Sequence, residues 1–100
     1  MFQTISMKEF QQCCEGTINI IDVRGQAMYE EGHVAHAVNM PFSELETTSS
    51  KLDPSTTYHV ICQRGSTSQR ACTLLAQKGF DVINVEGGMS QWTGDMECGC

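Results

Sequence analysis

The most informative stretch of the chain is residues 58–68, YHVICQRGSTS. Its first four residues form an apolar, strand-like run, and the residues after Gly65 predict a helix that extends to about Lys78. A cysteine at a corner between strand and helix faces backbone N–H groups and the positive end of the helix, and both favour negative charge. We therefore predict that Cys62 is a reactive nucleophile.

Hydrophobic periodicity and turn residues predict the remaining elements. Strands are expected at residues 18–23, 37–40 and 81–85. Helices are expected after a capping box at Ser6 and Glu9, at residues 26–31, and after a second capping-box pattern at residues 43–46, with residues 47–57 as a loop. This alternation predicts an α/β fold, with a central, mostly parallel sheet of about five strands and helices on both faces. Ligands bind such sheets at the carboxyl ends of the strands, where Cys62 falls.

Composition restricts the classes of function. The chain has 100 residues and a net charge of −6, so we expect one small domain without a basic surface for nucleic acid. Neither a membrane-spanning segment nor a signal peptide is expected. Because the six cysteines come without an export signal, we expect mostly free thiols in a reducing cytoplasm.

Four motifs, in this order, resemble the single-domain rhodanese family. They are IDVR at residues 21–24, GHV and AVNMP within residues 32–41, VIC at 60–62 with Gly65, and VEGGM at 85–89 with Trp92. The resemblance implies a rhodanese-like domain over residues 1–92, followed by a short tail at 93–100 that contains Cys-Gly-Cys.

The resemblance also implies an activity. A sulfurtransferase of this kind takes a sulfane sulfur from thiosulfate or a persulfide donor, holds it as a persulfide on Cys62, and passes it to a thiol or cyanide. The implied partners are a small anionic sulfur donor and a thiol acceptor such as glutathione or a thioredoxin-like protein. Neither a cofactor nor a metal is implied.

The loop after Cys62 distinguishes sulfur transfer from cysteine phosphatase or arsenate reductase chemistry. A phosphatase places an arginine six positions after the nucleophile to clamp phosphate, whereas this chain has Ser68 there, with Arg70 expected on the outer surface of the helix. Arg64 is either a cation for the donor or a solvated loop residue. The predicted substrate-binding residues are Gln63, Arg64, Gly65, Ser66, Thr67 and Ser68.

Accessory roles are predicted for residues outside the loop. Arg24 could line the pocket mouth, although an ion pair with Asp22 is the favoured interpretation. His33 is expected to be packed and hydrogen-bonded. His36 stands where rhodaneses usually have glycine, so either the turn differs or the side chain points outward, and a role in substrate choice stays open.

The other cysteines leave alternatives open. Cys72 is expected to be a buried core residue. Cys98 and Cys100 in the tail could resolve the Cys62 persulfide, form a strained disulfide, bind a soft metal, or be dispensable. Two alternative functions stay open. One is a persulfide carrier with little turnover of free thiosulfate, and the other is a thiol redox sensor that uses Cys62 with Cys98 or Cys100.

Overall fold

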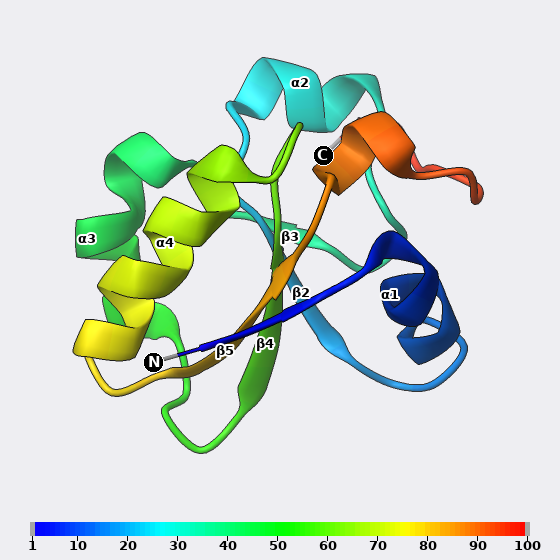
Figure 1. Cartoon of the computed structure of the whole chain (residues 1–100). Helices are drawn as coiled ribbons and strands as arrows, with labels where there is room; N and C mark the ends of the chain where they lie inside the picture. The colour runs from blue at the N-terminus through cyan, green and yellow to red at the C-terminus, as the bar shows by residue number, and fades with distance from the viewer. Residues whose placement is uncertain (1, 100) are drawn as a thin grey trace.

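The structure is a computed structural model that describes residues 2–99, and a five-stranded parallel sheet forms its centre (Figure 1). The strand order is β1-β5-β4-β2-β3, and every neighbouring pair is parallel. The strands are β1 (Gln3–Ile5), β2 (Asn19–Asp22), β3 (Val38–Asn39), β4 (Thr57–Ile61) and β5 (Asp81–Val85). The predicted α/β fold with a parallel sheet is confirmed.

Helices cover both faces of this sheet. The α-helices are α1 (Met7–Cys13), α2 (Gln26–Glu31), α3 (Leu45–Thr48) and α4 (Ser66–Gln77). Three short 3₁₀ segments complete the fold: η1 (Phe42–Glu44), η2 (Ser49–Lys51) and η3 (Gly88–Gln91). In Figure 1, α3 and α4 lie on one side of the sheet and α1 lies on the other.

The core is divided by the sheet into two hydrophobic clusters. The first joins Ile21 and Val60 to Ala71, Cys72 and Leu75 of α4, and these three α4 residues are fully buried as predicted. The second cluster lies on the opposite face, where α1 and η3 pack. Its buried members are Met7, Phe10, Ile20, Val34, Ala37, Ile61, Val85 and Met89.

Two local predictions were wrong, and one strand was not located from the sequence. Residues 43–46 do not form a capping box, because Ser43 lies inside η1 and α3 has no side-chain cap. Residues 47–57 are not all loop, since α3 and η2 extend to Lys51. The strand β1 was missed because it is short and largely exposed; it pairs with β5 through Ile5 and Val85.

The backbone of His36 adopts a left-handed conformation. Its φ is +72°, and its side chain is exposed. No other non-glycine residue within residues 2–99 has a positive φ. Glycine adopts this conformation readily, and the exposed side chain agrees with the expectation that His36 points outward.

The described residues after Trp92, 93–99, are attached to the segment around α2. The backbone of His33 donates to the Glu97 carbonyl at 2.9 Å and accepts from the Glu97 N–H at 2.8 Å. The Gly99 N–H donates to the Glu30 carbonyl at 2.8 Å. None of the helices in the described part of the chain has the length and apolar character that a membrane span needs.

Candidate active site

Cys62 lies directly after β4 and is 2% exposed. The backbone N–H of Gly65 donates to its Sγ atom at 3.0 Å. Gly65 caps the N-terminus of α4 with a φ of +104°, a conformation that side chains disfavour. The thiol therefore lies at the N-terminus of a 12-residue helix with a backbone donor aimed at its sulfur.

The segment that follows β5 forms main-chain hydrogen bonds with Cys62 and the loop after it. The N–H groups of Met89 and Ser90 donate to the carbonyls of Cys62 and Gln63, each at 2.8 Å. A Cβ on Gly88 would stand 2.2 Å from the Cys62 carbonyl oxygen, so only glycine allows this approach. Sequence reasoning treated Met89 as a core residue only. The glycine pair after a strand was the available signal for a close backbone contact.

Ser68 and Asn84 form a buried polar pair beneath the loop. Both residues are fully buried. The Ser68 Oγ lies 3.0 Å from the Gly65 carbonyl and 2.5 Å from Asn84 Oδ1. Ser68 was predicted to bind substrate, but the structure uses its hydroxyl inside the fold, where it holds the peptide that precedes α4. Asn84 was not singled out from the sequence, because an isolated polar residue in a strand carries no signal of its partner.

Arg24 connects the loop to the strand β2. Its guanidinium forms the expected ion pair with Asp22, with Nη2 and Oδ2 2.8 Å apart. The same Nη2 donates to the Gly32 carbonyl at 2.7 Å, and Nη1 donates to Gln63 Oε1 at 3.3 Å. Arg24 is only 8% exposed. It therefore orients the Gln63 side chain while its own charge is matched by Asp22.

The outer part of the loop remains accessible. Arg64 and Ser66 are exposed, whereas Gln63 and Thr67 are half-buried. Arg70 is exposed on α4, and its guanidinium carbon lies 4.8 Å from the centre of the Phe42 ring. The cation that could substitute for the phosphatase arginine is therefore directed to an aromatic ring of η1.

The described cysteines are all free thiols. Burial, followed by the nearby Cys62, raises the pKa of Cys72 to about 12, as expected for a core residue. Cys98 is exposed, with its Sγ 3.5 Å from the Glu31 carbonyl. Cys100 lies outside the described residues. Within residues 2–99, no group of three or more His, Cys, Asp or Glu side chains is arranged to hold a metal ion.

His33 is packed rather than available as a base. It is 4% exposed, its ring stacks on Tyr29 with the ring centres 3.7 Å apart, and Nδ1 lies 2.7 Å from the Tyr29 carbonyl oxygen. Its Nε2 lies 4.0 Å from the Glu97 carboxylate. These contacts confirm the expected structural role.

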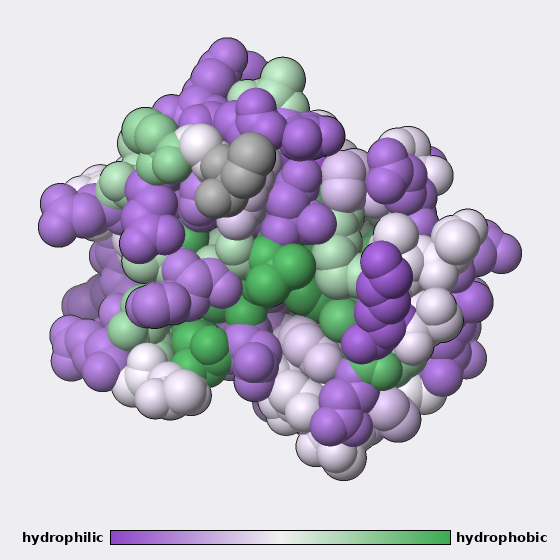
Figure 2. Space-filling model, turned by 180° about the vertical axis from the view of Figure 1, so that it is seen from behind, coloured by the Kyte–Doolittle hydropathy of each residue, from purple (hydrophilic) through white to green (hydrophobic). Residues whose placement is uncertain are grey.

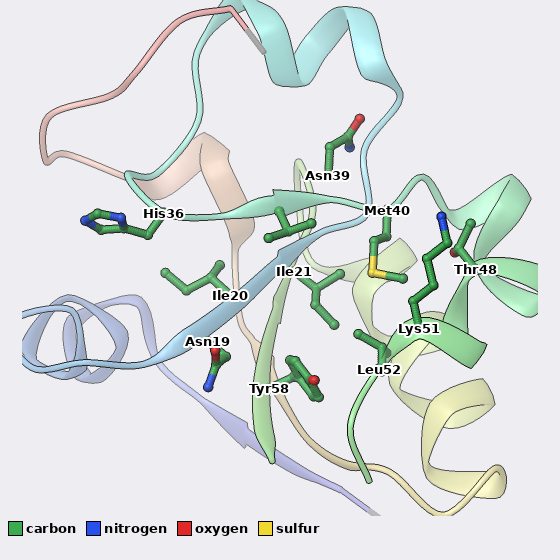
Figure 3. Close-up of a pocket in the computed structure, with 11 residues that line it drawn as sticks. Asn19, Ile20, Ile21, His36, Asn39, Met40, Thr48, Lys51, Leu52 and Tyr58 are labelled. Atoms are coloured by element: carbon green, nitrogen blue, oxygen red, sulfur yellow. The ribbon is translucent and has the colours of Figure 1, made fainter. Parts of the chain in front are cut away.

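A separate cavity of about 360 Å³ lies on the β3 side of the sheet, and Cys62 is not among its lining residues (Figure 3). Ile21, Leu52 and Tyr58 supply its apolar wall, and His36 and Lys51 are among its polar lining residues. On the rear face of the molecule, hydrophobic surface gathers in a central hollow (Figure 2).

The family model for the rhodanese-like domain matches residues 6–95. This range includes the loop after Cys62, the Ser68–Asn84 pair and the segment after β5. The chain belongs to the rhodanese family. The four motifs that resembled this family thus fall within the matched region.

Several relatives of this rhodanese domain carry names from sulfur chemistry. A putative sulfur carrier protein, YrkF, of Bacillus subtilis is 35% identical over 93% of this chain, which spans 52% of that relative's length. A putative sulfurtransferase, YtwF, of the same species is 34% identical, with 92% of this chain and 88% of the relative covered. The thiosulfate sulfurtransferase GlpE of Coxiella burnetii is 33% identical, with the same coverage. Sulfur transfer is the general chemistry that these names share.

Solved structures show the same rhodanese fold. A rhodanese-related protein from Thermoplasma volcanium is 30% identical, with a TM-score of 0.85 over 91% of this chain and 90% of that one. A rhodanese-like domain protein from Staphylococcus aureus is 25% identical, with a TM-score of 0.91 over 99% of this chain and 100% of that one.

Proposed function

We propose that this rhodanese is a sulfurtransferase that carries the transferred sulfur as a persulfide on Cys62. The observation that supports this most directly is the Gly65 N–H, 3.0 Å from Sγ at the N-terminus of α4. A backbone donor and a helix terminus stabilise an anionic sulfur. The same groups serve the thiolate and the persulfide, since both are anions at this end of the loop.

The proposed first half-reaction loads the nucleophile. The Cys62 thiolate attacks the outer sulfur of thiosulfate, a new S–S bond forms, and sulfite leaves with the electron pair of the broken bond. Arg64 is the exposed cation of the loop, so we assign it to attract this small anionic donor.

The proposed second half-reaction unloads the sulfur. An acceptor thiolate, such as that of glutathione or of a thioredoxin-like protein, or cyanide attacks the outer sulfur of the persulfide. The S–S bond to Cys62 breaks, the Cys62 thiolate leaves, and the acceptor carries the sulfur away. No net oxidation or reduction of the protein occurs, and the reducing cytoplasm is the compartment that we propose for this cycle.

Intact-mass measurement after incubation with thiosulfate tests the proposal. We expect the wild-type protein to gain the mass of one sulfur atom, and Cys62→Ser to gain none. Cys98→Ser serves as the matched control, and we expect it to load normally. A wild-type protein that gains no sulfur, or a Cys62→Ser protein that still gains it, would overturn the proposal.

A persulfide carrier is the second candidate function. It is favoured by the relative named as a sulfur carrier and by the burial of Cys62, which is only 2% exposed. Steady-state turnover with thiosulfate and cyanide separates the two functions. An enzyme turns over many times, whereas a carrier loads once from a persulfide donor and turns over thiosulfate slowly.

A further inference from the structure

An open groove lies beside the nucleophile loop, and three methionines line it. These are Met28 of α2, Met89 of η3 and Met96 of the segment after η3. Gln63 is also part of the lining and directly follows Cys62 in the chain. Because the Met89 N–H holds the Cys62 carbonyl at 2.8 Å, the groove adjoins the proposed site of sulfur transfer.

Two of these methionines are exposed to an unusual degree. Met28 is 40% exposed and Met96 is 55% exposed. Across the described residues, only one other large hydrophobic side chain is exposed, namely Val38 at 58%. Of these three exposed hydrophobic side chains, Met28 and Met96 therefore line the same groove. Flexible thioether side chains adapt to varied partners, and apolar side chains gathered on a surface indicate an interaction site.

Backbone hydrogen bonds and the space beside Gly32 fix the position of Met96. The backbone hydrogen bonds between Glu97 and His33 attach its segment to the end of α2. Beneath it, Gly32 leaves room for the side chain, since a Cβ on Gly32 would lie 3.1 Å from the Met96 Sδ. The helix α2 has no buried residue, so Met28 is not required by the core.

Glu31 lines the groove, and the two chain segments that contribute Met28 and Met96 are acidic. Residues 25–33 and 93–99 contain no lysine or arginine but four carboxylates, which contribute −4 to the net charge of −6; they are Glu30, Glu31, Asp95 and Glu97. Arg24 also lines the groove, but Asp22 matches its charge. An apolar contact lined by Glu31 and formed by acidic segments is complementary to a basic partner.

We propose that this methionine groove docks a basic protein segment that carries the acceptor cysteine for the Cys62 sulfur, an inference that rests on the proposed function. The docked cysteine thiolate attacks the outer sulfur of the Cys62 persulfide. The S–S bond to Cys62 breaks, Cys62 leaves as a thiolate, and the partner cysteine becomes the persulfide. Small anionic donors would instead approach by the exposed Arg64.

Two synthetic peptides test the docking step. Each carries one cysteine between leucines, flanked by lysines in one peptide and by glutamates in the other, and each is mixed with the persulfide-loaded protein. At low salt, we expect the lysine peptide to accept sulfur at least about tenfold faster, and we expect added salt to reduce the difference. Equal rates for the two peptides would overturn the proposal.

Variants of the groove provide the structural control. We expect Met28→Gln with Met96→Gln to slow transfer to the lysine peptide by about tenfold and to leave transfer to cyanide unchanged. Val38→Gln removes a similarly exposed apolar side chain outside the groove, and we expect it to behave as the wild type. A groove variant that transfers to the lysine peptide at the wild-type rate would refute the role of the methionines.

A binding measurement separates this proposal from the proposed function. The lysine peptide with serine in place of cysteine is titrated against unloaded protein by fluorescence anisotropy. Salt-sensitive binding that is lost in the groove variant supports docking even if thiosulfate fails to load Cys62. Loading without such binding overturns the docking surface and leaves the sulfurtransferase proposal intact.

Discussion

Gly88 lies against the backbone of Cys62, and a Cβ on it would stand 2.2 Å from the Cys62 carbonyl oxygen. Its φ of +59° also places it in the left-handed region. The contact connects the segment after β5 to Cys62, so the Cys62 carbonyl cannot move without displacing η3.

We expect Gly88→Ala to destabilise the fold and to slow sulfur loading of Cys62, because the new methyl group collides with main-chain atoms that cannot rotate away. Gly79→Ala is the matched control, since Gly79 has a φ of +93° and open space around it. The control should lose about 1–2 kcal/mol of unfolding free energy in urea. Gly88→Ala should lose about 1–3 kcal/mol more. Equal losses would show that the collision is relieved elsewhere.

Removing the Ser68 hydroxyl should loosen the loop. Ser68→Ala leaves Asn84 without a buried partner, so we expect a loss of about 1–3 kcal/mol of unfolding free energy. Because the Gly65 peptide is then less restrained, alkylation of Cys62 by iodoacetamide should change in rate as well. Ser66→Ala removes an exposed hydroxyl from the same helix, and its stability should stay within about 0.5 kcal/mol of the wild type. Indistinguishable stabilities of the two variants would contradict the buried pair.

Cys72 should resist thiol reagents in the folded protein. With its pKa raised to about 12 by burial, only about one Cys72 in ten thousand is a thiolate at pH 8, and the residue is fully buried. Peptide mass mapping after iodoacetamide treatment at pH 8 should find it unmodified until urea unfolds the chain. The exposed Cys98 serves as the internal control and should be modified quickly. Modification of Cys72 before unfolding would contradict its burial.

His59 should make stability depend on pH. Burial lowers its pKa below the ordinary value of 6.5, although an Asn19 backbone contact and Asp81 act in the opposite direction. The unfolded chain therefore takes up this proton at a higher pH than the folded chain does. The contribution of His59 to the free energy of unfolding is therefore fully present above about pH 6.5. It is lost as the pH falls through the lowered pKa that His59 has in the folded chain.

Urea unfolding at a series of pH values between 5 and 8 measures this contribution. His59→Gln should show a shallower loss of unfolding free energy toward acid than the wild type. The control is His36→Gln, which removes an exposed histidine and should retain the wild-type slope. If the free energy of unfolding fell equally with pH in all three proteins, His59 would be ruled out as the source of the pH dependence.

Elements with strong periodicity were predicted closely from the sequence. The bounds of β5 and α2 agree with the expectation, and α4 ends next to the predicted Lys78. The segments β5 and α4 bury one face or both faces, so their pattern repeats at the period of the backbone, whereas α2 buries no residue and its end was predicted from Gly32. The strand β1 lacks that pattern, because an edge strand of three mostly exposed residues depends on its partner β5 for pairing.

The position of Cys62 between a strand and a helix followed from local signals in the sequence, whereas the residues that hold its loop in place did not. Cys62 stands between a strand and a helix that are contiguous in sequence. Asn84 and Ser90, in contrast, reach the loop only because β5 is the neighbour of β4 in the sheet. The second capping-box pattern failed for a related reason: Leu45 is fully buried, and its packing rather than the Ser43 hydroxyl determines where α3 begins.

The hydrogen bonds from Met89 and Ser90 to the loop carbonyls have a consequence for how such a domain can diversify. These bonds, like the Gly65 donor to sulfur, are made by main-chain atoms. The exposed side chains at residues 64 and 66 contribute to none of them. Natural selection can therefore exchange these side chains without dismantling the main-chain framework that holds Cys62 and its loop in place.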